Sequence, residues 1–218
     1  MSAIEHVVIA AAGMGSRLGH GIPKCLVEAG GRSLIEQQLT LFRHIPDIRV
    51  VVGYMEQTVI DAVSRVNPDV IIVRNPSYRE TTTQDSYALG AEGLTGHCLF
   101  LDADIIFEPA SMRKFLNFAA ARPLVIGVTA AKTDDAVFAI TRTSSEGEFE
   151  IVAFSSERAD FEWANVVWAP AESFIRGGGP VFERLKMWLP APAAVIVSYE
   201  IDTEEDLRRA RQFCYTTR

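Results

Sequence analysis

The sequence of 218 residues has no apolar run long enough to cross a membrane. Its longest apolar stretches, such as PLVIGVTAA from Pro123, fall far short of the roughly 18 residues that a membrane-spanning helix needs. The first apolar run has no basic segment before it and leads into glycines instead of a cleavage site, so it predicts no secretory signal. We therefore expect a cytoplasmic protein with no membrane partner.

Cysteine and net positive charge are also scarce. Cys25, Cys98 and Cys214 are odd in number and far apart, which gives no support for a disulfide framework or a CxxC zinc pair. The 21 basic and 28 acidic residues give a net charge of -7, which argues against nucleic acid as a partner. An anionic small substrate therefore needs a local basic pocket.

Short runs rich in valine and isoleucine alternate with longer segments of helical period, a pattern typical of α/β proteins. We expect one domain over residues 1–218, with a Rossmann-like mixed, mainly parallel sheet and helices on both faces. The predicted strands are residues 6–13, 49–54, 69–75, 97–104, 123–131 and 193–200; the predicted helices are 33–42, 56–66, 85–94, 109–121 and one capped by Thr203. Runs 137–143, 149–154 and 164–170 alternate and predict an antiparallel meander, a small lobe added to the same sheet.

Glycines cluster where the first predicted strand ends. Gly13, Gly15 and Gly19 follow this strand, and glycine lets backbone N–H groups approach a phosphate closely. Gly19 comes one position too late for the dinucleotide-binding fingerprint, and the second strand is not followed by the acidic residue that this fingerprint needs. Neither the Gly-Lys-Ser/Thr of a P-loop nor the GxSxG of a covalent hydrolase occurs. Arg17 and Lys24 flank the loop and suit a triphosphate, unless both are ordinary solvated residues.

The segment AAGMGSRLGHGIPKCLVEAGGRSLIEQQL, from Ala11 to Leu39, resembles the opening of nucleotidyltransferases that activate phosphorylated small molecules with an NTP. In that family, of MobA-like NTP transferase fold and including sugar-phosphate and phosphocholine cytidylyltransferases, the motif is AAGxGxR followed by Pro-Lys. The resemblance implies that Arg17 and Lys24 are catalytic residues that stabilise charge at the reacting phosphorus. It also implies a set of nucleotide-binding residues in the loop, namely Ala11, Ala12, Gly13, Met14, Gly15 and Ser16.

Two aspartates, Asp102 and Asp104, stand at the end of a predicted strand, where α/β sheets place their ligands. They point to opposite sides of an extended strand, so only one needs to face the nucleotide. The resemblance implies that Asp104 binds Mg²⁺ and that Asp102 assists at the nucleotide. It adds Asp202 as a second ligand, although an aspartate there can also simply stabilise the N-terminus of the following helix. Mg²⁺ takes one or two carboxylates, completed by phosphate oxygens and waters.

Two segments are candidates for recognising the rest of the substrates. The segment RNPSYRETTTQDSYALG resembles the part that family members place beside the base, and it predicts Gln84 and Ser86 as nucleotide contacts; the alternative is ordinary helix capping. The second segment, around residues 161–168, combines aromatic and acidic side chains, which together can bind a quaternary ammonium or a protonated amine. The alternative is that its tryptophans only pack in the core. The predicted acceptor-binding residues are Trp163, Asn165, Trp168 and Glu200.

Together these features predict a Mg²⁺-dependent nucleotidyltransferase, in which a phosphate or phosphonate oxygen of the acceptor attacks the α-phosphorus of an NTP and pyrophosphate leaves. CMP transfer from CTP is favoured because the choline-like and inositol-like branches of the family are cytidylyltransferases. The acceptors expected are phosphocholine-, aminoethylphosphonate- or inositol-phosphate-like. The alternatives are a sugar-1-phosphate uridylyl- or thymidylyltransferase, a molybdopterin-type nucleotidyl transfer, an NAD-dependent dehydrogenase and a non-catalytic nucleotide-binding regulator. The oligomeric state stays open, a dimer included.

Overall fold

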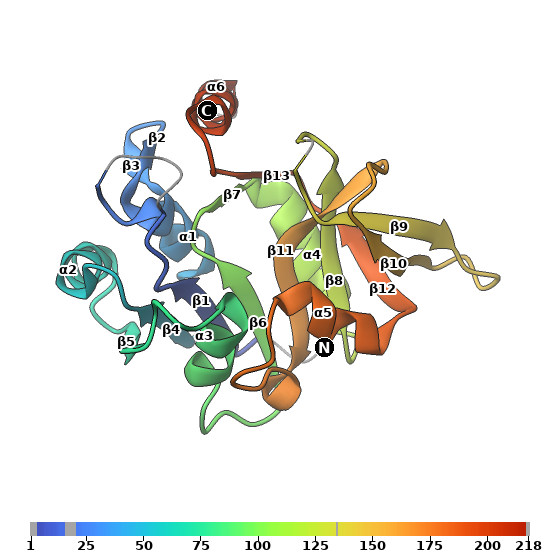
Figure 1. The fold of residues 1–218 in the computed structure, drawn as a ribbon, viewed down its shortest axis with the longest axis horizontal. Coiled ribbons are helices and arrows are strands. Elements are labelled where there is room, and N and C mark those ends of the chain that lie inside the picture. The colour runs from blue at the N-terminus through green and yellow to red at the C-terminus, as the bar shows by residue number, and fades with distance from the viewer. Residues whose placement is uncertain (1–3, 16–20, 134, 217–218) are drawn as a thin grey trace.

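The computed structural model describes residues 4–15, 21–133 and 135–216. Its main element is a nine-stranded sheet in the order β5-β4-β1-β6-β11-β8-β12-β10-β9 (Figure 1). Two small antiparallel pairs, β2 with β3 and β7 with β13, lie outside this sheet. In chain order the strands are β1 (His6–Ala11), β2 (Glu28–Ala29), β3 (Arg32–Ser33), β4 (Asp47–Val52), β5 (Ile71–Arg74), β6 (His97–Asp102), β7 (Ile105–Phe107), β8 (Val125–Ala130), β9 (Phe138–Thr143), β10 (Phe149–Ser155), β11 (Phe161–Pro170), β12 (Ala191–Val195) and β13 (Ser198–Glu200).

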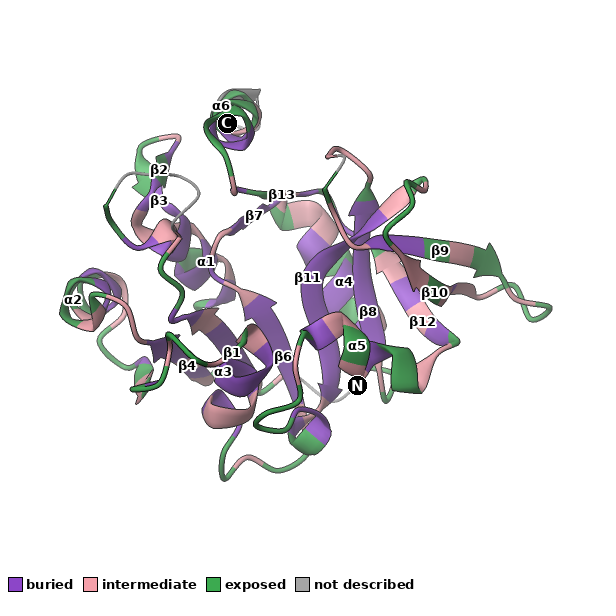
Figure 2. Cartoon of the chain, in the orientation of Figure 1, coloured by how far each residue is buried: buried purple, intermediate pink, exposed green. Residues whose placement is uncertain are grey.

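Helices cover both faces of the sheet, as the sequence predicted. On one face α1, α2 and α4 bury side chains such as Phe42, Val63 and Phe115 against the strands. On the other face α3 and α5 bury Tyr87 and Leu185, so the central strands are enclosed on both sides (Figure 2). The helices are α1 (Leu34–Phe42), α2 (Glu56–Val66), α3 (Thr83–Gly90), α4 (Pro109–Ala119), α5 (Val181–Leu185) and α6 (Glu204–Thr216).

The direction of the strands creates one edge at which loops gather. β5, β4, β1 and β6 are parallel neighbours, and the register pairs Ala11 with Val52 and Ala10 with Asp102. β8 and β12 run in the same direction, because β11 is antiparallel to both β6 and β8 while β12 is parallel to β8. The carboxyl ends of six strands therefore meet at this edge, which we call the carboxyl edge. The predicted α/β class with a mixed sheet is confirmed.

One predicted element lies elsewhere in the sheet. The sequence placed residues 164–170 in an outer meander, but β11 runs through the centre of the sheet, with Val166 opposite Leu101 and Val167 opposite Ile126. Every residue of β11 between its two terminal positions is buried, as a strand enclosed on both faces requires. β9 and β10 do form an antiparallel hairpin, and β9 also pairs with β11, so strands β11, β8, β12, β10 and β9 close on themselves.

The helix boundaries follow local chemistry. α1 starts at the predicted capping box, in which Ser33 and Glu36 satisfy each other's backbone groups. α3 begins at Thr83, earlier than the predicted residue 85, because Thr82 and Asp85 form a second capping box. It ends at Gly90, where an added Cβ would lie 2.4 Å from Val8 of β1. The sequence did not predict the short helix α5.

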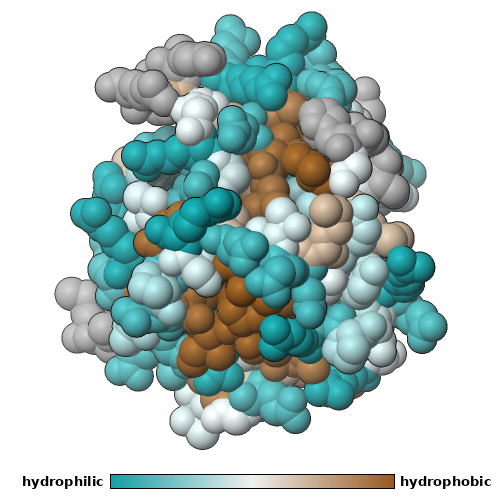
Figure 3. Space-filling model, turned by 90° about the vertical axis from the view of Figure 1, so that its left-hand side faces the viewer, coloured by the Kyte–Doolittle hydropathy of each residue, from teal (hydrophilic) through white to brown (hydrophobic). Residues whose placement is uncertain are grey.

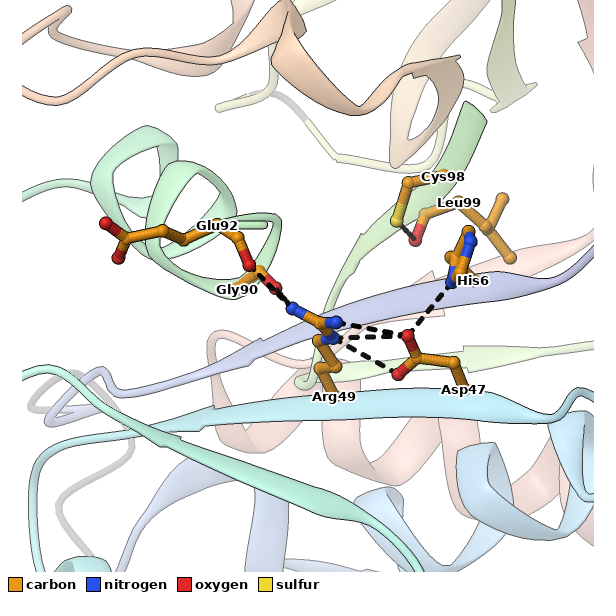
Figure 4. A network of polar contacts seen from close by, with 7 residues as sticks. All are labelled: His6, Asp47, Arg49, Gly90, Glu92, Cys98 and Leu99. Atoms are coloured by element: carbon orange, nitrogen blue, oxygen red, sulfur yellow. Dashed lines mark hydrogen bonds and ion pairs between the residues drawn. The ribbon is translucent and has the colours of Figure 1, made fainter. Parts of the chain in front are cut away.

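A polar network fixes the far end of α3 at the opposite edge of the sheet (Figure 4). Arg49 of β4 pairs with Asp47 and donates to the backbone carbonyls of Gly90, at 3.1 Å, and Glu92, at 2.9 Å. The Nδ1 atom of His6 lies 2.9 Å from the same aspartate. An arginine bonded to carbonyls just past a helix satisfies groups that the helix leaves unpaired. The network therefore ties α3 to β4 at the end away from the carboxyl edge.

The surface shows one further feature of the fold. β5 ends the sheet and leaves Ile71 exposed. The face of the molecule on that side carries apolar patches between hydrophilic side chains (Figure 3). No helix in the described part of the chain is long and apolar enough to span a membrane.

Candidate nucleotide and metal site

A cavity of about 270 Å³ opens at the carboxyl edge, where the predicted glycine loop leaves β1. Its walls come from the end of β1, the loop before α3, and the turn after β6. Burial, with the negative charge of Asp104, raises the pKa of the Cys25 thiol to about 12, so this cavity residue is neutral and supplies no thiolate nucleophile. The predicted site residues that line the cavity are Ala11, Ala12, Gly13, Gly15, Lys24, Ser86, Asp102 and Asp104.

Gly15 makes room for the lysine that enters the cavity. Its φ is +60°, a backbone conformation that favours glycine, and an added Cβ would lie 2.4 Å from Cγ of Lys24. Two independent restraints thus require glycine at this position. Arg17 and Ser16, also predicted for this loop, lie outside the described residues.

The ammonium group of Lys24 joins two carboxylates from distant parts of the chain. Its Nζ donates to Oδ2 of Asp104 at 2.8 Å and to Oδ1 of Asp202. Burial by itself lowers the pKa of a lysine, but the charges and hydrogen bonds of the two aspartates outweigh burial and hold the pKa of Lys24 above its usual value. Lys24 is therefore a fixed cation that neutralises part of an acidic site.

A third carboxylate completes the acidic group. Carboxylate oxygens of Asp104, Glu200 and Asp202 lie within 4.8 Å of one another. Glu200 is an exposed residue, but partial burial of its carboxyl group and the negative charges of Asp104 and Asp202 raise its pKa to about 8. Nδ2 of Asn165 donates to Glu200 at 2.8 Å from a bulge in β11, where Asn165 has a φ of +48°. The sequence assigned Glu200 to acceptor binding and did not predict that it joins the two aspartates.

The turn between β6 and β7 holds Asp104 in place. Gln38 of α1 reaches this turn, and its Nε2 donates to the carbonyls of Asp102 and Ile105, both at 2.8 Å. On the other side of the turn, the hydroxyl of Tyr87 donates to Oδ1 of Asp102 at 2.6 Å. Burial, with the charge of Asp104, raises the pKa of Asp102 to about 8. Sequence reasoning missed Gln38, because a glutamine inside a helix carries no sign of the loop that it will meet.

One small apolar cluster lies beneath Lys24, Asp104 and Asp202. Each of these residues is followed or preceded within three positions by a member of the cluster. Because residues next to all three in the sequence pack in one cluster, the charged groups stay within reach of one another although 178 positions separate Lys24 from Asp202. The members are Val27, Ala29, Leu34, Ile106, Ile201, Leu207 and Ala210.

The donor set fits a hard divalent cation. Oδ1 of Asp104 is buried and has no hydrogen-bond partner among the described residues. Carboxylate oxygens are the ligands that Mg²⁺ prefers, and an orphaned buried oxygen is the kind of atom that a cation satisfies. The sequence left open that Asp202 only stabilises the N-terminus of α6. In the structure Thr203 and Asp206 cap this helix, since the side chain of each accepts a hydrogen bond from the backbone N–H of the other. The site can therefore accept Mg²⁺ on Asp104, Glu200 and Asp202.

A family model for the MobA-like NTP transferase domain matches residues 7–168. The chain belongs to this family. The matched residues include most of β1, the glycine loop, Lys24, Asp102 at the end of β6 and Asp104 in the turn that follows. The resemblance drawn from the sequence is confirmed at the level of the family.

Solved structures of three transferases share this MobA-like fold. The inositol-1-phosphate CTP transferase from T. maritima has a TM-score of 0.76 and 14% identity, covering 99% of this chain and 97% of that chain. The CTP:phosphocholine cytidylyltransferase LicC from Streptococcus pneumoniae has a TM-score of 0.75 and 20% identity, covering 96% and 99%. The UDP-glucose pyrophosphorylase from Acinetobacter baumanii has a TM-score of 0.74 and 14% identity, covering 96% and 93%.

Two curated relatives align with half of this MobA-like chain. The bifunctional protein GlmU of Clavibacter sepedonicus is 30% identical over 116 residues, which are 51% of this chain and 24% of that protein. The bifunctional enzyme IspD/IspF of Bradyrhizobium sp. strain BTAi1 is 33% identical over 116 residues, 51% of this chain and 27% of that protein. The chain spans about a quarter of the length of these relatives.

The wall of the cavity before α3 is polar. Asn75 is buried, and its Nδ2 donates to Thr81 Oγ1 at 2.9 Å and to Ser86 Oγ at 3.4 Å. Ser86, which the sequence predicted as a nucleotide contact, lines the cavity and carries a hydroxyl group there. Gln84 does not line the cavity: it is fully buried, and its Nε2 donates to the carbonyl of Ile175 at 3.0 Å. Met14 is exposed and is not part of the cavity wall.

The predicted acceptor residues separate into two groups. Asn165 and Glu200 lie together beside the acidic group. Trp163 is buried in the core cluster beneath α3 and α5. Trp168 lies at the opposite edge of the sheet, where it pairs with Leu99 near the start of β6 and its Nε1 donates to the carbonyl of Arg122 at 3.0 Å. The structure therefore does not bring Trp168 to the site, and its environment agrees with the packing alternative. Trp163 lies two residues before Asn165 on β11, and its buried Nε1 has no hydrogen-bond partner among the described residues.

Proposed function

We propose that this chain is a Mg²⁺-dependent nucleotidyltransferase that transfers a nucleoside monophosphate, in the first instance CMP from CTP, to a small phosphate or phosphonate acceptor. The single observation that carries this proposal is the ammonium of Lys24 between Asp104 and Asp202 at the mouth of a glycine-lined cavity. Two anionic substrates can meet beside an acidic site only where cations offset the repulsion. Lys24 is a cation of the protein that is already fixed there.

In the proposed reaction an oxygen of the acceptor bonds to the α-phosphorus of the NTP as the bond to the pyrophosphate oxygen breaks. The phosphate or phosphonate oxygen is already ionised, so no protein group has to remove a proton. The chain positions both substrates and neutralises charge. Backbone N–H groups of the loop at Gly13 and Gly15 suit the phosphates, and Lys24 acts on the reacting phosphoryl group as a point charge.

Asp104 and Asp202, with Glu200, would hold the Mg²⁺ ion. When bound, the ion neutralises negative charge on the phosphate oxygens. Asn165 orients Glu200, and Gln38 orients the turn that carries Asp104. Arg17 belongs to the proposed phosphate-binding set on the basis of the motif alone.

The choice of substrates rests on two lines of support. The names of two structural neighbours identify CTP transferases, acting with inositol-1-phosphate and phosphocholine, which favours CTP. The UDP-glucose pyrophosphorylase makes a sugar-1-phosphate uridylyltransferase the main alternative. The phosphocholine in the name of one of these neighbours favours an acceptor that carries a protonated or quaternary amine as well as its phosphorus group.

The test is pyrophosphate release from CTP, UTP, ATP, GTP and dTTP with Mg²⁺, against phosphocholine, phosphoethanolamine, 2-aminoethylphosphonate, inositol phosphate and glucose-1-phosphate. Release confined to CTP and an amine-bearing acceptor is the expected result. Release with UTP or dTTP and glucose-1-phosphate would replace the proposed substrates by the sugar alternative. NTP binding without release across the panel would favour a regulatory protein, and no NTP binding would refute the proposal.

A further inference from the structure

A segment from the second half of the chain lies against the helix that forms one wall of the cavity. Residues 175–179, which we call the glycine strap, connect the turn after β11 to α5. Three side chains at the start of α3 hold the strap. Gln84 Nε2 donates to the carbonyl of Ile175 at 3.0 Å, and Thr82 Oγ1 donates to the carbonyl of Gly179 at 2.8 Å. The backbone N–H of Gly177 donates to Oδ1 of Asp85 at 2.6 Å.

The same turn of α3 faces the cavity from its other side. Thr83 and Ser86 line the cavity, and residues three apart share one side of a helix. Gln84 and Asp85, between them in sequence, project away from that side and meet the strap. The first turn of α3 is thus enclosed between the strap and the proposed nucleotide.

The contact between strap and helix is sterically specific. An added Cβ on Gly178 would lie 1.5 Å from Nε2 of Gln84. Gly178 does not have a positive φ, so a side chain there would only have to displace the amide of Gln84. Gly177 and Gly179, in contrast, favour glycine because of their φ values of +71° and +78°. The strap can lie this close only because it has no side chain at its centre.

An aromatic anchor continues the contact toward the metal site. Phe174, directly before the strap, is buried with its ring 5.1 Å from that of Tyr87 and 4.8 Å from that of Phe100. Tyr87 is the residue whose hydroxyl donates to Asp102. The strap and its anchor therefore touch α3 at successive positions that lead from the cavity wall to the carboxylates.

We infer that Gln84 and Asp85 are positioning residues, which hold the glycine strap and thereby fix the first turn of α3 in the place that nucleotide binding requires. The inference rests on the proposed function, since it concerns the wall of the proposed NTP cavity. It gives Gln84 a role other than base contact. If only a fraction of the protein molecules has this turn in the binding-competent position, the apparent Kd for the nucleotide equals the intrinsic Kd divided by that fraction.

The test begins with Gly178→Ala, which forces Gln84 away from the strap. We expect the Kd for CTP, titrated with Mg²⁺ by calorimetry, to rise about tenfold, the factor that corresponds to roughly 1.4 kcal/mol. We expect kcat at saturating CTP and KM for the acceptor to stay at their wild-type values, since the carboxylates are not moved. A loss of folding alone would lower the active fraction and leave the Kd unchanged.

A second variant and a control separate the contact from general disturbance. Gln84→Ala loses the hydrogen bond to the carbonyl of Ile175, so this variant should also bind CTP more weakly than the wild type. Combined with Gly178→Ala it should add little further loss, because both substitutions remove the same contact. Arg176→Ala changes the strap only at an exposed ion pair with Glu92, at 3.2 Å, and should bind CTP like the wild type. A Gln84→Ala variant that binds CTP as tightly as the wild type would contradict the role of Gln84.

Hydrogen exchange in the ligand-free protein distinguishes this inference from the proposed function. The amides of residues 83–86 should exchange faster in Gly178→Ala than in the wild type, with no nucleotide present. Unchanged exchange together with an unchanged Kd for CTP would overturn the inference. Faster exchange in a protein whose wild type binds no NTP would support the positioning contact and refute the proposed function.

Discussion

At the scale of single residues, the site is organised by charge. Lys24 lies between Asp104 and Asp202, and Glu200 adds a third carboxylate within 4.8 Å of the other two. Glu200, with a pKa of about 8, is mostly protonated at neutral pH, but the two aspartates still outweigh the single ammonium and leave the site with excess negative charge. The lysine and a metal ion are therefore complementary partners of the same acidic group.

Lys24→Ala tests this balance. We expect kcat to fall at least about 100-fold, since a charge that stabilises the reacting phosphoryl group is lost. With a chelator present, the free energy of unfolding should fall by about 1–3 kcal/mol, because the carboxylates are left without their cation. Mg²⁺ should restore more stability to this variant than to the wild type in thermal unfolding. Lys114→Ala, an exposed lysine of α4, is the control and should change neither quantity.

Asp85 provides a pH-dependent test. Burial alone raises its pKa, but hydrogen bonds from the backbone of Gly177 and from Thr82 outweigh burial and lower it below its ordinary value of 3.8. A lowered pKa in the folded state contributes stability that is complete above the unfolded pKa and disappears as the pH falls through the folded one. Asp85→Asn should therefore cost about 1 kcal/mol at neutral pH and progressively less below about pH 4 in urea unfolding. The same loss at every pH would contradict this assignment.

Some residues of the site could be predicted from the sequence and others could not. The motif around Gly13 and Pro23 identifies Lys24, and the end of a strand identifies Asp104, because both signals are local. Gln38 and the place of Glu200 depend on contacts between elements that are far apart in the chain. Such contacts leave no mark on the neighbouring residues.

At the scale of elements, helix α6 completes the acidic group of Asp104, Glu200 and Asp202 from the end of the described chain. It begins two residues after Asp202, and its Leu207 and Ala210 belong to the apolar cluster beneath Lys24 and Asp104. The rings of Tyr199 and Phe213 contact each other at a tilt, with centroids 4.9 Å apart, and add a second contact between β13 and α6. The docking of α6 therefore sets the position of Asp202.

Leu207→Ala measures this dependence. Leu207 is fully buried, so its truncation should cost about 2–5 kcal/mol in the free energy of unfolding. It should also weaken Mg²⁺ binding, measured by calorimetry at a temperature where the variant is folded. Leu116→Ala, in α4 and in a different buried cluster, should lower stability while leaving Mg²⁺ affinity unchanged. Equal loss of Mg²⁺ affinity in both variants would argue against a specific role for α6.

Helix boundaries that depend on a few neighbouring residues could be predicted from the sequence. The capping box of Ser33 and Glu36 marks the start of α1 in the sequence and in the structure. The place of β11 was not predicted, because its alternating residues after a hairpin suit an outer meander as well as a central strand. Only the pairing with β6 and β8, which no local pattern encodes, decides between them.

At the scale of the whole molecule, the two halves of the chain share one sheet. β11, from the second half, pairs with β6 of the first half, and the glycine strap, also from the second half, is bonded to α3 of the first half. We expect unfolding to be a single cooperative transition. Trp163, Trp168 and Trp188 all lie in the second half, whereas α1 to α4 precede residue 120. Tryptophan fluorescence and far-ultraviolet circular dichroism should therefore give the same urea midpoint, and two separate midpoints would contradict a shared core.

The central position of β11 also has a consequence for biosynthesis. The chain emerges from the ribosome amino end first, so β6 is made well before the strand that covers its free side. Until then, Leu99, Phe100 and Leu101 belong to an open strand edge, which is a surface prone to pair with other chains. The newly made first half therefore carries an unpaired strand edge at the centre of the future sheet until β11 is made.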